Sequence, residues 1–411
     1  MPVTPENTLG LYISIPFCRS KCTYCNFASG VHPASEHARY VSRLIEDLRA
    51  AGAWAARMDV ELPRRVDTVY LGGGTPSLLA PELIERLFAA VRAEFAVDRD
   101  AEITVECAPG QIADQTLEAL RAAGVNRVSL GVQSFIDREA ATSGRLHSRT
   151  VVLEDLSRLR AAGIANLSMD LIAGLAGQTF ASWEESLAVL AAAGVPHASV
   201  YMLEVDEDSR LGREVLSHGA RYHAELVPSD DAIAQMYATA IDRLDETGLR
   251  QYEISNFCRS GFESRHNLRY WQRRPYLGLG LDASSALLGT GRWPRRLLRS
   301  TTSDDLKAYI AGASPVETEW LEVDRQHEEA WFLGLRLNAG VNVSAVEREF
   351  GQAIVAPALE VVRRLAADGL VVFDGKTVRL TAQGRLLSNN VFQEFLDLRA
   401  EKRETGAGMR A

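Results

Sequence analysis

The chain has 411 residues, of which 46% are hydrophobic and 24% are charged, and its net charge is −9. This composition is that of a globular protein, and the negative charge argues against nonspecific binding of nucleic acid. No apolar run reaches the ~18 residues of a membrane span, and the first residues lack the basic and apolar parts of a secretory signal. We therefore expect a cytoplasmic protein with two domains, or one large α/β domain with an appendage.

Between residues 11 and 205, short β-rich runs alternate with longer amphipathic stretches. The expected strands are residues 11–15, 68–71, 103–106, 127–131, 167–171 and 198–203. The expected helices are residues 36–57, 81–95, 114–123, 150–162 and 182–193. This alternation predicts the α/β class, with parallel strands in a partial (β/α)6 TIM-like barrel over residues 1–205. Functional side chains should then lie at the C-terminal ends of the strands.

The pattern changes after residue 205. Residues 206–290 are expected to form a helical insertion and a loop-rich region that completes the core, and 291–320 a linker punctuated by Trp293-Pro294 and Ala313-Ser314-Pro315. Over 321–398 the order helix–helix–helix–hairpin, with strands at 370–373 and 378–380 and a last helix at 381–396, predicts a winged-helix-like domain. This domain lacks a basic recognition face, so DNA binding is not expected. Residues 399–411 are expected to be a flexible tail.

Three closely spaced cysteines follow the first expected strand. Cys18, Cys22 and Cys25 have the spacing C-x3-C-x2-C. Thiolates this close in sequence can converge on zinc, copper(I) or an iron–sulfur cluster. A closed zinc site needs four ligands, for which His32 and His37 are the nearby candidates, whereas a four-iron cluster held by three cysteines keeps one iron open. Disulfides are disfavoured, because the chain has 5 cysteines and no secretory signal.

Polar residues also follow the later expected strands. The run Gly72-Gly73-Gly74-Thr75 offers backbone N–H groups and a hydroxyl to a ligand, and the absence of a following GK[ST] excludes a P-loop. Glu106, Gln133, Arg145 and Asp170 stand at or after the third, fourth and fifth strands. Taken singly, the glycine run can also be a tight turn, and each acid a solvated strand end.

The chain resembles the radical SAM superfamily and its HemN-like family in a series of motifs. In order, these are the cysteine spacing with Tyr24 before the third cysteine, the run GGGTP, and the segments GVQSF, GR-x-H and DLI-x-GL. The resemblance extends from Tyr12 to about Leu396. In that superfamily, the open iron of a [4Fe-4S] cluster chelates S-adenosylmethionine, and reduction then yields a deoxyadenosyl radical. The resemblance implies a [4Fe-4S] cluster on Cys18, Cys22 and Cys25. It implies an S-adenosylmethionine site lined by Tyr12, Tyr24, Gly73, Gly74, Thr75, Glu106, Gln133, Arg145 and Asp170.

Two details are similar to the HemW-type haem chaperones rather than to the coproporphyrinogen dehydrogenases of the family. Phe27 stands where the dehydrogenases carry a fourth cysteine, and residues 265–271 contain the pattern H-N-x-x-Y-W, which is linked to haem in HemW-type proteins. One departure is Ser284, which stands where HemW-type proteins carry a histidine. The resemblance implies haem contacts at His266, Asn267, Tyr270 and Trp271.

The leading hypothesis is a haem chaperone with haem as cargo and a [4Fe-4S] cluster and S-adenosylmethionine as cofactors. Its implied partners are respiratory haemoproteins and an electron donor protein, and a homodimer is compatible with it. The alternatives are oxidative decarboxylation of coproporphyrinogen III, a radical SAM reaction on another substrate, and a zinc-binding scaffold. The residues leave open whether S-adenosylmethionine is cleaved, and whether His266 and its neighbours only hydrogen-bond a loop and fill the core. Cys107 and Cys258 are expected to be core residues.

Overall fold

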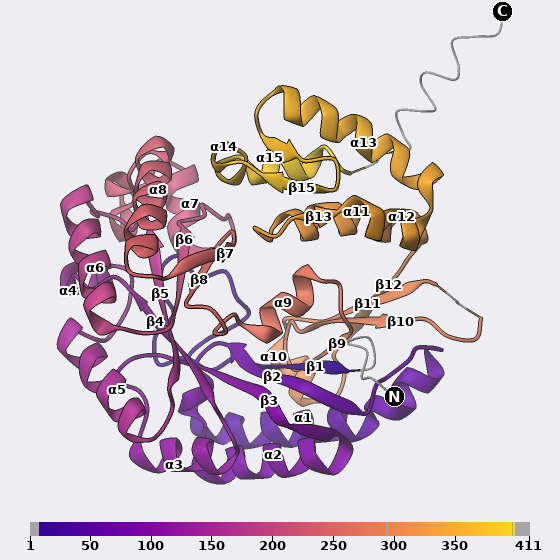
Figure 1. Ribbon diagram of the computed structural model, residues 1–411. Helices are drawn as coiled ribbons and strands as arrows, with labels where there is room; N and C mark the ends of the chain where they lie inside the picture. Colours follow the sequence, from indigo (N-terminus) through magenta and orange to yellow (C-terminus); the bar gives the residue numbers. More distant parts are fainter. Residues whose placement is uncertain (1–7, 293–294, 397, 399–411) are drawn as a thin grey trace, which may run out of the picture.

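The computed structural model describes residues 8–292, 295–396 and 398, and it centres on a curved sheet of 12 strands (Figure 1). Six neighbouring strands in chain order are parallel, as expected of a partial (β/α)6 barrel. They are β1 (Leu9–Ile15), β2 (Arg65–Gly73), β3 (Ala96–Cys107), β4 (Arg127–Gln133), β5 (Asn166–Ala173) and β6 (His197–Met202). The predicted fold class is therefore confirmed.

Helices connect these strands and surround the barrel on its outside (Figure 1). They are α1 (Ala34–Arg57), α2 (Pro81–Glu94), α3 (Asp114–Ala122), α4 (Asp137–Thr142), α5 (Arg149–Ala161) and α6 (Phe180–Ala193). Each longer helix turns an apolar stripe inward; in α1, for example, Tyr40, Val41, Leu44 and Leu48 recur at helical spacing and are buried. Cys107 and Cys258 are buried, as predicted.

Further strands extend both edges of the sheet. β7 (Arg250–Glu253) and β8 (Asn256–Cys258) follow β6, while β9 (Tyr276–Leu279), β10 (Ser284–Leu288), β11 (Leu297–Thr302) and β12 (Val316–Leu321) continue from β1. The prediction of a linker at 291–320 is therefore wrong, because β11, α10 (Leu306–Ile310) and β12 lie there. Trp293-Pro294 falls outside the described residues. β12 reads VETEWL and is mostly exposed, so this edge strand has no apolar run to mark it.

Residues 206–250 form α7 (Arg210–Leu216), a 3-10 segment η3 (Arg221–Leu226) and α8 (Asp230–Glu246). The short helix α9 (Arg265–Trp271) then precedes β9. None of the described helices is both long and apolar enough to cross a membrane.

The C-terminal residues have a separate hydrophobic core and a three-stranded sheet. Their elements are α11 (Val323–Leu335), β13 (Val341–Asn342), α12 (Val343–Phe350), α13 (Gln352–Ala367), β14 (Val371–Phe373), β15 (Thr377–Leu380), α14 (Ala382–Leu386) and α15 (Ser388–Gln393). The predicted hairpin is present as β14 and β15. The predicted last helix is instead divided into α14 and α15 at Leu387, whose φ of −104° and ψ of 27° leave the helical region. The expected tail at 399–411 lies outside the described residues.

The C-terminal unit contacts the barrel next to β7. The backbone N–H of Asn338 donates to the Tyr252 carbonyl at 2.9 Å, and its side-chain amide donates to the Gln251 carbonyl at 2.7 Å. The Arg336 guanidinium lies 4.1 Å from the centre of the Trp271 ring in α9. These contacts link the C-terminal unit both to an edge of the sheet and to α9.

Candidate functional site

The loop between β1 and α1 carries Cys18, Cys22 and Cys25, all half-buried and free of disulfides. Its two ends are paired, because the Cys18 N–H donates to the Gly30 carbonyl at 2.8 Å and the Gly30 N–H donates to the Pro16 carbonyl at 2.9 Å. The loop follows the C-terminal end of β1, the edge of the barrel where functional residues were predicted.

Segments from three other parts of the chain hold this cysteine loop in place. The Thr23 N–H donates to the Ser143 carbonyl at 3.0 Å, and the Thr23 carbonyl accepts from the Leu211 N–H at 2.8 Å. The Thr75 N–H donates to the Phe17 carbonyl at 2.8 Å. The segments that follow β2, β4 and β6, including the end of α4 and the start of α7, thus hold the cysteine loop in place.

The donor set fits an iron–sulfur cluster. Burial raises the pKa of the Cys18 thiol, and the hydroxyls of Ser29 and Thr75 oppose that shift; the Thr75 hydroxyl donates to the Cys18 sulfur at 3.8 Å. Within the described part of the chain, no three His, Cys, Asp or Glu side chains come close enough to hold one metal ion. The ligands of a cluster bind separate iron atoms, so they need not meet at one point.

The two histidines considered as a fourth zinc ligand have other contacts. The His32 Nδ1 lies 3.1 Å from the Glu36 carboxylate, and the His37 ring stacks on Phe17 with 3.9 Å between ring centres. Neither contact directs the imidazole toward a site shared with the thiols, so the geometry gives the zinc alternative no support.

The glycine run after β2 packs directly on the cysteine loop. The Gly74 N–H donates to the Ile15 carbonyl at 2.9 Å. A Cβ on Gly74 would lie 2.8 Å from the Ile15 and Phe17 carbonyl oxygens, and one on Gly73, where φ is +98°, would lie 2.9 Å from the Ser14 hydroxyl. Glycine is therefore required here for close approach of two backbones.

We expect Gly74→Ala to disturb the cysteine loop. The added methyl group must push the backbone near Phe17 away, which costs about 1–3 kcal/mol of folding free energy and misplaces the thiols. Iron retained after anaerobic reconstitution checks this expectation. The matched control is Gly52→Ala in α1, where the nearest atom to a new Cβ is 3.8 Å away. Equal iron retention in the two variants would contradict the role assigned to Gly74.

Glu106, at the end of β3, is held by two groups of β2. The Tyr70 hydroxyl donates to Oε1 at 2.8 Å, and the Gly73 N–H donates to Oε2 at 3.2 Å. Burial raises the pKa of Glu106 to about 7, while the Tyr70 hydrogen bond lowers it. This carboxylate therefore changes its protonation state near neutral pH.

The other predicted cofactor residues lie around Glu106 and the cysteine loop. The Arg145 guanidinium donates to the Tyr24 hydroxyl at 2.9 Å, which joins the loop after β4 to the cysteine loop. Asp170 on β5 accepts from the Ser129 hydroxyl at 3.0 Å, and burial raises its pKa. Gln133 has a φ of +68°, in the left-handed region. A residue other than glycine usually occupies this region at a cost in conformational energy.

The structure thus brings the predicted S-adenosylmethionine residues to one end of the barrel, and their role stays a prediction. A Cβ on Gly73 would lie 3.6 Å from the Tyr12 hydroxyl, and one on Gly131 would lie 3.1 Å from both Gln133 and Arg145. Tyr70 is the residue that the sequence analysis missed. Its signal is the strand period of two, which places Tyr70 on the same face as Gly72.

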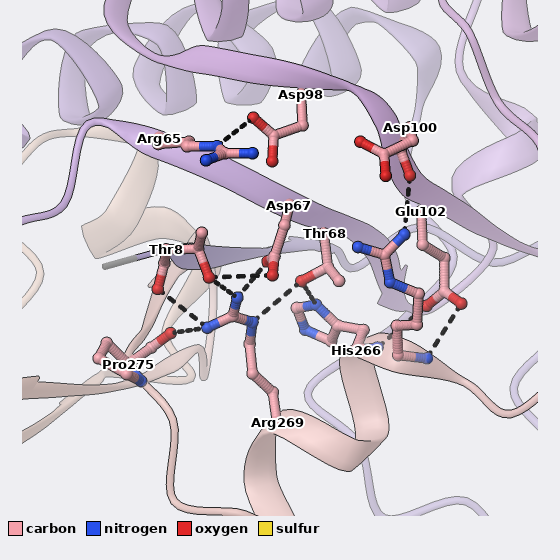
Figure 2. A network of polar contacts seen from close by, with 11 residues as sticks. Thr8, Arg65, Asp67, Thr68, Asp98, Asp100, Glu102, His266, Arg269 and Pro275 are labelled. Carbon is pink, nitrogen blue, oxygen red and sulfur yellow. Dashed lines mark hydrogen bonds and ion pairs between the residues drawn. The ribbon is translucent and has the colours of Figure 1, made fainter. Parts of the chain in front are cut away.

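Helix α9, which carries the H-N-x-x-Y-W pattern, lies against the face of β2 and β3 opposite to the covering helices (Figure 2). The Glu102 carboxylate accepts from the backbone N–H groups of Arg265 and His266, both at 3.0 Å. Arg269 is fully buried and donates to the Thr8 and Pro275 carbonyls at 3.1 and 2.8 Å, and it also pairs with Asp67. Charged hydrogen bonds therefore fasten α9 to the barrel.

Both ring nitrogens of His266 have partners inside the protein. Nδ1 lies 2.9 Å from the Thr68 hydroxyl, and Nε2 lies 2.9 Å from the Tyr270 hydroxyl (Figure 2 shows the Thr68 contact). Burial lowers the pKa of His266 to about 3, and the nearby Arg269 and Arg127 lower it further. The imidazole is therefore neutral at pH 7. It can bind iron only after one of its ring nitrogens gives up its hydrogen bond to Thr68 or Tyr270.

The other residues of the pattern also pack within the protein. Tyr270 meets the Tyr276 ring edge-on at 4.7 Å, and Trp271 lies under Arg336. The Asn267 backbone N–H bonds the Ser264 hydroxyl that caps α9. This is the arrangement expected if the segment fills the core, and the haem contacts predicted here stay a prediction.

Phe27 and Ser284, the two single positions compared with the family above, lie in different places. The Phe27 side chain lies in the cysteine loop and is 61% exposed. Ser284 begins β10, where its hydroxyl hydrogen-bonds that of Thr301 at 2.9 Å. Asp282, in the turn before β10, has a φ of +53°, a conformation that glycine adopts more easily.

Comparison with known proteins identifies both parts of the chain. Residues 12–190 match the radical SAM superfamily, and residues 321–387 match the HemN C-terminal domain. A solved structure of coproporphyrinogen III oxidase (HemN) from Escherichia coli, a radical SAM enzyme, superposes with a TM-score of 0.79 at 25% identity. The match covers 95% of this chain and 91% of that one.

Relatives from several organisms are similar over nearly their full length. Heme chaperone HemW of Lactococcus lactis is 33% identical, covering 94% of this chain and 96% of that protein. Heme chaperone HemW of Mycobacterium tuberculosis is 35% identical, covering 95% and 96%. Mouse mitochondrial radical S-adenosyl methionine domain-containing protein 1 is 31% identical, covering 96% and 89%. The chain therefore belongs to the HemW family of the radical SAM superfamily.

Proposed function

We propose that this protein is a cytoplasmic haem chaperone, which binds haem and delivers it to haemoproteins of respiration. The main support for this proposal is the loop of Cys18, Cys22 and Cys25 at the end of the barrel. In this loop, the exposed Phe27 replaces the fourth cysteine of the dehydrogenases. Full-length relatives that are named heme chaperones support the same function. An electron donor protein and a homodimer form part of the proposal.

The cysteine loop would hold a [4Fe-4S] cluster, and the residues around Glu106 would hold S-adenosylmethionine. When bound, the cluster supplies one-electron reduction to S-adenosylmethionine. An acid and an arginine, here Glu106 and Arg145, suit the zwitterionic methionine end. An acid or amide acceptor, here Asp170 or Gln133, suits the ribose hydroxyls.

We place the haem contact at α9, on His266, Asn267, Tyr270 and Trp271. The buried, doubly bonded imidazole means that iron ligation requires α9 to release His266 from Thr68 or from Tyr270. Aromatic rings next to the histidine suit the apolar face of a porphyrin. Haem binding at this site would therefore be coupled to a movement of α9.

The deciding experiment reads two signals from one anaerobically reconstituted sample. Haem binding is followed by absorbance titration, and coproporphyrinogen III turnover is measured with S-adenosylmethionine and a reductant. We expect about one haem bound per chain and no decarboxylated product. Decarboxylated product would replace this proposal with the dehydrogenase alternative, and the absence of both signals would leave a radical SAM protein acting on another substrate.

His266→Ala is expected to weaken haem binding and to leave the iron content of the cluster unchanged. The control is His197→Ala, because His197 is also fully buried and its two ring nitrogens bond Ser168 and Tyr252. Haem affinity measured for both variants separates loss of a ligand from loss of a buried histidine. Equal haem affinity in His266→Ala and in the unchanged protein would place haem elsewhere.

A further inference from the structure

The orientation of Glu106 depends on a side chain that lies outside the set predicted to touch the cofactor. The Tyr70 hydroxyl donates to Oε1 at 2.8 Å, and the Gly73 N–H donates to Oε2 at 3.2 Å. A Cβ on Gly72, between these two residues, would lie 3.0 Å from Oε1. The carboxylate thus lies in contact with β2, and the groups of β2 orient its two oxygens.

The Tyr70 ring is itself fixed in an aromatic cluster, which we define as Tyr12, Tyr70 and His266. The ring centres are 6.1 Å apart for Tyr12 and Tyr70, 5.2 Å for Tyr70 and His266, and 6.4 Å for Tyr12 and His266. Thr68 and Tyr270 fix the His266 ring, as described above. The aromatic cluster therefore leaves the Tyr70 ring one packed position, from which its hydroxyl reaches Glu106.

The protonation of Glu106 also depends on Tyr70. The pKa of Glu106 is raised to about 7, mainly by burial. The Asp170 charge also raises this pKa, whereas the Tyr70 hydrogen bond and the Arg145 charge lower it. A hydrogen bond donated to the ionised form favours that form, and the ionised form is the one that binds a cation or accepts from hydroxyls. The titratable groups of the neighbouring elements that interact electrostatically with Glu106 are Tyr12 of β1, Tyr70 of β2, Arg145 after β4, Asp170 of β5, Tyr201 of β6 and Tyr270 of α9.

We propose that Tyr70 is a positioning residue of the S-adenosylmethionine site, which orients the Glu106 carboxylate through its hydroxyl while His266 of α9 packs against its ring. The proposal rests on the proposed function for the identity of the ligand. It gives α9 a part in the cofactor site that does not depend on where haem binds. In this proposal, Tyr70 acts through Glu106.

The first test compares S-adenosylmethionine binding to reconstituted Tyr70→Phe and to the unchanged protein by equilibrium dialysis. Phenylalanine keeps the aromatic cluster and removes only the hydroxyl. Loss of a charge-assisted hydrogen bond predicts about tenfold weaker binding or more. Because the pKa of Glu106 rises when this bond is lost, the acid-side fall in affinity should move to higher pH. Unchanged affinity and an unchanged pH profile would overturn the proposal.

A double-mutant cycle shows whether Tyr70 acts through Glu106. In a Glu106→Gln background, Tyr70→Phe should cause little further loss of affinity, whereas additive losses would contradict the proposed route. The control is Tyr237→Phe in α8, which removes a buried hydroxyl bonded to the Ile254 carbonyl. Tyr237→Phe should leave both the affinity and its pH profile unchanged.

A measurement without cofactor separates this proposal from the proposed function. Infrared titration of the cofactor-free protein follows the Glu106 carboxylate, and Glu106→Gln assigns its band. Tyr70→Phe should move that titration to higher pH, and an unmoved titration would overturn the proposal. If the band moves while the unchanged protein binds no S-adenosylmethionine, the proposed function fails and the link between Tyr70 and Glu106 stands.

Discussion

Cys22→Ser should yield a folded protein that holds no cluster. Three thiolates are the minimum for a [4Fe-4S] cluster with one open iron, and a serine hydroxyl is a poor substitute for a soft sulfur ligand. We expect iron to fall from ~4 atoms per chain after reconstitution to near zero, with loss of the brown cluster absorption. The fold should survive, because the neighbouring Thr23 backbone bonds Ser143 and Leu211 whatever the side chain at residue 22.

The control for this prediction is Cys258→Ser. Cys258 is buried in β8, where it pairs with β6 and β7, so its substitution removes a thiol without removing a predicted ligand. This variant should retain the iron content of the unchanged protein. If Cys22→Ser assembled a cluster with normal iron content, the assignment of the loop would be wrong. Zinc bound in place of iron by the unchanged protein would favour the scaffold alternative.

Arg269→Met should destabilise the protein more than other single substitutions in α9. Its guanidinium is fully buried and joins Thr8, Asp67 and Pro275, so removing it takes the only cation of this network away from the largely buried Asp67 carboxylate, which keeps its hydrogen bond from the Thr8 hydroxyl. Breaking a buried ion pair by removal of one member costs about 3–5 kcal/mol. We expect a loss of this size in the free energy of unfolding, measured by urea denaturation of the cofactor-free protein.

Arg265→Met on the same helix is the matched control. Arg265 is exposed, and its guanidinium donates to the Asp100 carbonyl at 2.7 Å. An exposed contact of this kind contributes about 1 kcal/mol or less. Equal losses in the two variants would mean that the network of Arg269 does not anchor α9. The comparison also tests whether release of α9, which haem binding at His266 requires, is energetically expensive.

Much of the candidate site follows from local sequence. Cys18, Cys22 and Cys25 lie within one loop, so their spacing alone predicts a shared ligand. Glu106 lies near the C-terminal end of β3 and Asp170 lies within β5, and parallel strands carry their C-terminal ends to one edge of the barrel. The alternation of strand and helix predicted the six parallel strands for the same reason, because each unit has its own local periodicity.

Other features depend on residues far apart in the chain. The His266 to Thr68 hydrogen bond spans 198 positions, and the pair of Arg269 and Asp67 spans 202. No periodicity in either segment encodes such a partner. For the H-N-x-x-Y-W pattern, the sequence left open haem contact or a place in the core, and the fold buries His266 between Thr68 and Tyr270. The unexpected strands β11 and β12 are similar cases, because each is defined by the neighbour with which it pairs, and β12 is a polar edge strand.

The sequence by itself determined the cysteine loop, the glycine run and the class of the fold, because these rest on spacing and periodicity within short segments. Only the tertiary structure decided that Tyr70 holds Glu106 and that α9 packs inside the barrel on buried charges. The physical reason is that hydrogen bonds and burial depend on distances in space, and folding brings together residues whose separation along the chain carries no such information.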